Sequence, residues 1–98
     1  MGYNARMIQS FAHKGLERFF TSGSTAGIQA MHAKRLRLIL ALLSDAIRIN
    51  DMDAPGLSLH PLKGNLAGRW AVTVQANWRV VFRFEDGHAH VVDYLDYH

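Results

Sequence analysis

The feature that most constrains the fold is an alternation of apolar and polar residues through the last third of the chain. Segments 69–76, 77–85 and 88–98 carry apolar or aromatic side chains mostly at alternate positions, the period of a β-strand with one buried face. An Asp-Gly pair separates the last two segments, and the polar stretch "QAN" (75–77) lies where the first two meet. Both patterns are typical of tight hairpin turns. The sequence therefore predicts an antiparallel meander.

Helical periodicity precedes the strands. Leu16, Phe19 and Phe20 have the i, i+3, i+4 spacing of one helical face. A longer helix is predicted from Ala30 to Ile47, with an apolar stripe formed by Leu36, Ile39, Leu40, Leu43 and Ile47.

A weak alternation in residues 7–11 predicts a short strand before the helices. No repeat or linker divides the chain, so we expect one domain over residues 7–98 after an N-terminal extension of residues 1–6. The predicted fold is α+β: a short N-terminal strand and two helices packed on one face of an antiparallel sheet.

Composition limits the possible function classes. The 98 residues include no cysteine, so disulfides and thiolate zinc sites are excluded and a reducing compartment is favoured. No apolar run approaches the roughly 18 residues needed to span a bilayer, and residues 1–6 lack the apolar segment of a signal peptide. We expect a cytoplasmic protein.

The charge balance is mildly basic. The net charge is +3, and Lys and Arg together number 11. Arginine predominates among them, and its planar guanidinium suits bidentate contact with phosphate. A small basic domain favours a nucleic-acid partner, although an ordinary soluble domain with a slightly high pI is equally consistent with these numbers.

Alternation in segment 77–85 separates two faces. Trp78, Val80, Phe82 and Phe84 fall on one face, expected to cover the helices, while Asn77, Arg79, Val81 and Arg83 fall on the other. Arg79 and Arg83 then either bind a phosphate backbone or only keep an exposed sheet face soluble.

Five side chains together match the needs of a ribonuclease that works without a metal: His60, Lys63, Arg79, Tyr97 and His98. Histidine is suited to proton transfer near neutral pH. Arginine and lysine supply positive charge for a phosphoryl group, and tyrosine can bind a phosphate or stack on a base. Spacing alone does not show that these residues converge.

Three motifs carry a resemblance to a known family. At "LHPLKG" (59–64), "ANWRVVFRF" (76–84) and the closing "DYLDYH" (93–98) the sequence resembles HigB, a toxin of type II toxin–antitoxin modules in the RelE superfamily. The likeness runs from residue 7 to residue 98. It implies a RelE-like fold and an endoribonuclease that cleaves messenger RNA in the ribosomal A site, with no metal or other cofactor.

The resemblance also implies a set of site residues. Those expected in catalysis are His60, Lys63, Arg79, Asp96, Tyr97 and His98; those expected to bind RNA are Asn77 and Arg83. The histidines would transfer or position protons, Arg79 and Lys63 would stabilise phosphate charge, and Tyr97 would orient the RNA. Asp96 would orient a neighbour. Which histidine acts as the acid and which as the base stays open.

The family implies partners as well. The antitoxin would be a HigA protein with a helix-turn-helix, and operator DNA would be bound only through it. Lys34, Arg35 and Arg37 on the long predicted helix either meet ribosomal RNA or form a solvated face.

Two other functions are possible. One is a non-catalytic module of the same fold that binds RNA or a protein partner. The other is a metal site at His88 and His90, which share a strand face but lack a third ligand at a diagnostic spacing.

The end of the chain raises one further expectation. Regular alternation would place Asp96 and His98 on one face and Tyr97 on the other. His98 would also carry the α-carboxylate, and this negative charge would favour the protonated imidazole of a general acid.

Overall fold

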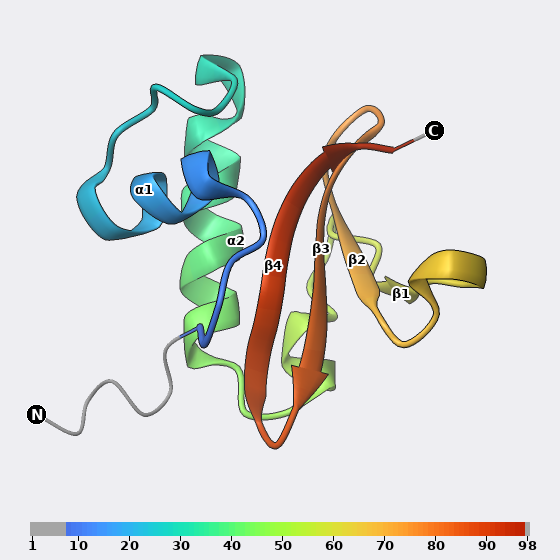
Figure 1. Cartoon of the computed structure of the whole chain (residues 1–98). Helices are drawn as coiled ribbons and strands as arrows, with labels where there is room; N and C mark the ends of the chain where they lie inside the picture. The colour runs from blue at the N-terminus through green and yellow to red at the C-terminus, as the bar shows by residue number, and fades with distance from the viewer. Residues whose placement is uncertain (1–7, 98) are drawn as a thin grey trace, which may run out of the picture.

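The computed structural model describes residues 8–97. Its elements in chain order are α1 (Lys14–Ser22), the 3₁₀ turn η2 (Ala30–His32), α2 (Ala33–Asp45), η3 (Ile49–Met52), β1 (His60–Pro61), η4 (Gly64–Leu66), β2 (Trp70–Gln75), β3 (Trp78–Glu85) and β4 (His88–Asp96). The four strands form one antiparallel sheet in the order β1-β2-β3-β4, and both helices lie on one side of it (Figure 1). The α+β fold predicted from the periodicities is confirmed.

Tight turns join the three long strands. Asp86 and Gly87 both have positive φ values in the β3–β4 turn, the geometry that the Asp-Gly pair predicts. The β2–β3 turn contains Ala76 at φ 52°, in the left-handed region. Regular pairing is interrupted between Thr73 and Gln75 and between Val81 and Arg83.

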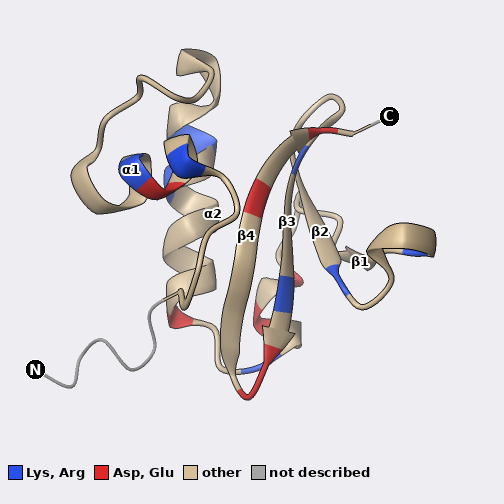
Figure 2. Cartoon of the chain, viewed as in Figure 1, with Lys and Arg blue, Asp and Glu red and all other residues tan. Residues whose placement is uncertain are grey.

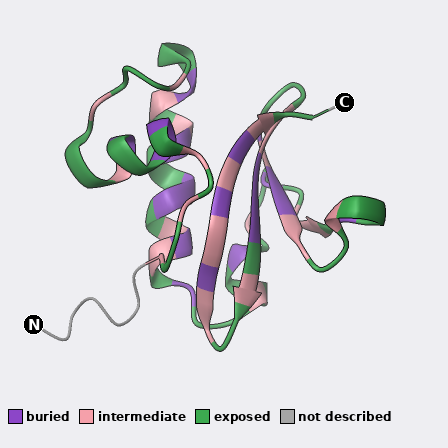
Figure 3. Ribbon diagram, in the orientation of Figure 1, coloured by how far each residue is buried: buried purple, intermediate pink, exposed green. Residues whose placement is uncertain are grey.

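The main core lies between the helices and one face of the sheet (Figure 3). Its fully buried side chains include Leu16, Leu36, Ile39, Leu43, Val72, Val80, Phe82 and Val92. Trp78 and Phe84 are partly buried against it, so the predicted helix-facing side of β3 is correct.

Local interactions fix the ends of α1. The Nδ1 atom of His13 accepts a hydrogen bond from the backbone N–H of Leu16, which satisfies a donor that the first turn would otherwise leave unpaired. Gly23 ends the helix at φ 81°, and its N–H donates to the carbonyl of Phe19. α1 is therefore capped at both ends.

A smaller apolar cluster covers part of the other face of the sheet. Leu62, Ala71 and Val81 are buried there, with Leu66 and Leu95 packed against them. Leu62 and Leu66 come from the segment that folds around β1 and η4. No helix of more than one turn among residues 8–97 covers this second face, which we call the open face.

Two predicted boundaries differ from the structure. The α-helical part of the second helix ends at Asp45, and Ile47 is exposed rather than part of the buried stripe. The predicted N-terminal strand is reduced, in its described part, to one parallel bridge between Phe11 and Val92. Residues 1–7 lie outside the described region. No helix in the part of the chain described here is long and apolar enough to cross a membrane.

Candidate functional site

Strand register places several predicted site residues on the open face. His60, Ala71, Val81 and Asp93 pair in one row across the four strands. The next row contains Thr73, Arg79 and Leu95. Since directly paired residues point to the same side of a sheet, the side chains of His60 and Arg79 share the open face. His60 and Arg79 are two strands apart across the sheet and two residues apart along it. At ordinary sheet spacing their Cα atoms are about 12 Å from each other.

A backbone carbonyl orients His60. The His60 Nδ1 atom lies 2.8 Å from the carbonyl oxygen of Ser58. A carbonyl oxygen only accepts hydrogen bonds, so Nδ1 carries the proton and the neutral ring has its lone pair on Nε2. Within residues 8–97 this Nε2 has no hydrogen-bond partner. The ring is therefore oriented, and one nitrogen stays available to exchange a proton.

Backbone carbonyls also hold Arg79. Its Nη1 donates to the carbonyl of Ala76 at 2.6 Å and to that of Trp78 at 3.2 Å. The side chain is half-buried. Its Nη2 has no hydrogen-bond partner in the described region. The guanidinium is thus fixed at Nη1 and can donate from Nη2 to an anion on the open face, while its Nε is buried without a partner in the described region.

The end of β4 is attached to the β2–β3 turn. The backbone N–H of Tyr97 donates to the carbonyl of Asn77 at 2.8 Å. Asp96 is paired with Trp78, which faces the helices, so the structure does not place Asp96 on the same face as Arg79. Tyr97 follows on the opposite side by alternation. His98 lies outside the described residues.

Two predicted cations lie at the margins of the open face. Lys63 is exposed on the loop after β1, where it precedes η4. Arg83 lies four residues from Arg79 on β3, about 13 Å along the strand, and forms an ion pair with Glu85. In Figure 2 the basic residues of β3 accordingly lie near its two ends. Arg83 can extend an RNA-binding track but does not belong to the His60–Arg79 pair.

The alternative metal site receives little support. His88 and His90 pair with Glu85 and Arg83 and so share the open face, near the β3–β4 turn. Across residues 8–97, no three His, Cys, Asp or Glu side chains are close enough together to hold an ion.

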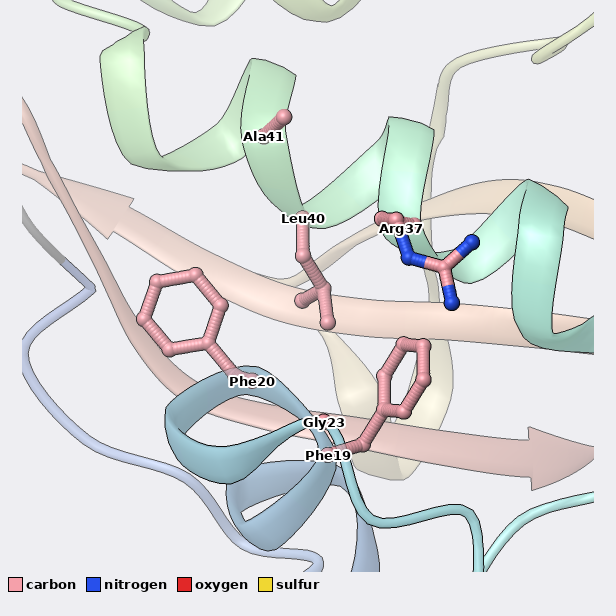
Figure 4. Close-up of a pocket in the computed structure, with 6 residues that line it drawn as sticks. All are labelled: Phe19, Phe20, Gly23, Arg37, Leu40 and Ala41. Atoms are coloured by element: carbon pink, nitrogen blue, oxygen red, sulfur yellow. The ribbon is translucent and has the colours of Figure 1, made fainter.

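A hollow lies between α1 and α2, apart from the predicted site residues. It has a volume of about 320 Å³ and is lined by Phe19, Phe20, Gly23, Arg37, Leu40 and Ala41 (Figure 4). The guanidinium of Arg37 lies over the ring of Phe19, 5.5 Å from its centroid. No predicted site residue lines this hollow. The candidate site is therefore an open surface, which suits an extended polymer better than a small enclosed ligand.

Comparison with known proteins shows the family of the chain. A family model described as "RelE-like toxin of type II toxin-antitoxin system HigB" matches residues 9–98. The chain belongs to the HigB-like toxin family. A curated relative, Endoribonuclease HigB of Proteus vulgaris, is 42% identical over 92 residues, which cover 94% of this chain and 100% of the relative. The resemblance to HigB seen in the sequence motifs is confirmed, and a type II toxin implies an antitoxin partner.

The structure also brings to the site residues to which the motifs assign no role. Thr73 lies opposite Arg79, and Asp93 lies in the row of His60. Ser58 and Ala76 hold the two site side chains through their carbonyls. Alternation assigns residues of one strand to faces, but the register between strands has no comparable signal in a single sequence.

Proposed function

We propose that this HigB-like toxin is a ribosome-dependent endoribonuclease that cleaves messenger RNA in the ribosomal A site without a metal cofactor. The observation that carries the proposal is the shared orientation of His60 and Arg79 on the open face, each held by backbone carbonyls. The match to an endoribonuclease over the whole of that relative supports the reaction class.

The proposed reaction is an attack by the RNA 2′-hydroxyl on the adjacent phosphorus. The 2′-oxygen forms a bond to phosphorus as the bond to the 5′-oxygen breaks, which leaves a 2′,3′-cyclic phosphate and a 5′-hydroxyl. His60 and His98 are assigned to the two proton transfers. Arg79, assisted by Lys63, stabilises the charge on the phosphoryl oxygens, and Tyr97, Asn77 and Arg83 hold the RNA. Asp96, which faces away from Arg79, would orient a neighbour at the strand end.

The setting and partners follow from the same proposal. The toxin acts on translating ribosomes in the cytoplasm, and a HigA-type antitoxin neutralises it. Operator DNA is bound only through that antitoxin.

The test is cleavage of a defined message on programmed ribosomes, mapped by primer extension. The proposal expects discrete cuts in the A-site codon, little cutting of the same RNA without ribosomes, and no effect of a transition-metal chelator at fixed magnesium. Binding to ribosomes without any cut would instead support a non-catalytic module, and rapid cutting of naked RNA would contradict ribosome dependence.

A further inference from the structure

Residues with left-handed backbone conformations occur at informative places. Four non-glycine residues of the described region have positive φ: Ser58 at 52°, Ala76 at 52°, Asp86 at 54° and Val91 at 48°. This conformation is unfavourable for L-residues with a side chain. Where such residues persist, the surrounding structure maintains them, and they are often found at functional sites.

Two of the four lie away from the candidate site, although Ala76 occupies the same first position of a two-residue hairpin turn as Asp86. Asp86 belongs to the Asp-Gly hairpin turn between β3 and β4, a position that favours this conformation. Val91 lies where the register of β3 and β4 shifts, and its N–H donates to the hydroxyl of Ser10. Neither residue has a hydrogen bond to a candidate site side chain within residues 8–97.

The other two both contact the site through their carbonyl oxygens. The carbonyl of Ser58 accepts from His60 at 2.8 Å, and that of Ala76 accepts from Arg79 at 2.6 Å. In an extended strand, a carbonyl lies in the plane of the sheet and points to the neighbouring strand. The left-handed conformation turns the peptide, so the carbonyl can reach a side chain two or three residues later.

We propose that Ser58 and Ala76 are positioning residues, whose left-handed backbone directs one carbonyl to His60 and one to Arg79 and so fixes the proton-transfer group and the phosphate-binding group relative to each other. The expected effect of these residues on RNA cleavage depends on the proposed endoribonuclease function. The geometry that it describes can be tested without the reaction.

The Ala76 turn also connects to the chain end. Asn77, the next residue, accepts the N–H of Tyr97 through its own carbonyl. One turn of the backbone therefore holds Arg79 by its side chain and Tyr97 by its main chain. A shift of this turn would displace both groups together, whereas a shift at Ser58 would displace only His60.

Substitution by valine tests the proposal, because a β-branched residue disfavours positive φ. Ala76→Val and Ser58→Val should lower kcat by roughly 10- to 100-fold with a smaller change in KM, since a small displacement of a catalytic group is costly. Ala76→Gly and Ser58→Gly, which accept this φ readily, should stay within about threefold of the parent protein by the same argument.

Asp86→Val is the matched control. It introduces the same strain into a turn that has no hydrogen bond to the candidate site, so it should lower stability without lowering kcat of the folded protein. If Asp86→Val reduced kcat as much as Ala76→Val, a general structural effect would explain both and the proposal would be overturned.

A double variant gives a second test of Ala76. Combining Ala76→Val with Arg79→Lys should give a smaller loss of kcat than the product of the two single losses. Multiplicative losses would also overturn the role assigned to Ala76.

NMR spectroscopy of the parent protein gives a readout independent of cleavage and of how the valine variants fold. The His60 ring should show the tautomer protonated at Nδ1, and the guanidinium protons of Arg79 should exchange more slowly than those of the exposed Arg18. The opposite tautomer, or equal exchange at Arg79 and Arg18, would overturn the proposed positioning. If the parent protein cleaved nothing while these signals were as expected, the proposed function would fail and the geometric assignment would stand.

Discussion

The Tyr94 hydroxyl lies 2.7 Å from Nδ1 of His32, a side chain that is only 3% exposed. The same hydroxyl accepts the backbone N–H of Gln29 at 3.2 Å, so its own proton is available to His32. The ring of Trp78 lies 4.7 Å from that of Tyr94, centroid to centroid. This network joins the segment before α2 to β4, two residues before Asp96.

The first prediction concerns the stability provided by this network. Tyr94→Phe keeps the ring but leaves the buried His32 Nδ1 and the Gln29 N–H without their partner. Because unpaired buried polar groups are costly, the free energy of unfolding should fall by about 1–3 kcal/mol. Denaturant titration measures this loss. Tyr97→Phe, at a side chain that is 39% exposed, is the control and should change stability little. Equal values for the two variants would contradict the importance of the Tyr94 bond.

The second prediction concerns stability at alkaline pH. Burial raises the pKa of Tyr94 above its ordinary value of 10.0, against a smaller opposite effect of the Gln29 N–H. As the pH rises above 10, the unfolded chain therefore loses this proton before the folded protein does, and stability falls. Unfolding titrations between pH 9 and pH 11 should show a steeper decline for the parent protein than for Tyr94→Phe. Parallel curves would contradict the raised pKa.

The third prediction concerns acid. The backbone N–H groups of Ile47 and Arg48 donate to Asp51 and lower the pKa of its carboxyl group below 3.8. Asp51 thus contributes stability above about pH 4 that is lost as the pH falls through the lowered pKa. Asp51→Asn should flatten this part of the stability curve. Asp53→Asn, which changes a neighbouring carboxylate without these bonds, serves as the comparison, and identical flattening in both variants would count against the assignment.

Much of the fold could be predicted because its periodicities are strong. The alternation of Trp78, Val80 and Phe82 identified the buried face of β3 correctly, and the Asp-Gly turn was recognised from two residues. The spacing of Ile47 fits the buried stripe, but α2 ends at Asp45 and the chain continues in an extended conformation from Ala46. Helix ends depend on capping and on the path of the next segment, which periodicity does not report.

The site could be predicted only in part. The motifs identify His60 and Arg79 as site residues. That both side chains lie on the open face follows only from the pairing of His60 with Ala71 and of Arg79 with Thr73. The pairing of Asp96 with Trp78 puts Asp96 on the side of the sheet away from Arg79, and the position of Tyr97 on the opposite side stays a prediction from alternation. The carbonyl contacts depend on left-handed residues, and Ser and Ala give no sequence signal for that conformation.

The fourth prediction tests His60 against another histidine of the open face. His60→Ala should lower kcat by about 10²- to 10⁴-fold, the range for loss of a general acid or base. His90→Ala is the matched control, because His90 pairs with Arg83 on the same face but far from Arg79. It should leave kcat nearly unchanged. Single-turnover cleavage on programmed ribosomes measures kcat for both variants. A similar loss in each would contradict a role of His60 in proton transfer and would indicate that both histidines only contact RNA.

The fifth prediction concerns the last residue. The hydrogen bond from Tyr97 to Asn77 fixes the backbone of Tyr97 beside the turn that holds Arg79, and His98 itself lies outside the described residues. If His98 donates or accepts a proton there, expression without antitoxin should arrest growth, and His98→Ala should relieve the arrest while the denaturant midpoint stays unchanged. A tag added after His98 should weaken toxicity more than the same tag before Met1, because it adds bulk directly beside the imidazole. Full toxicity of His98→Ala at equal expression would remove the terminal histidine from the mechanism and leave His60 to be paired with another proton donor.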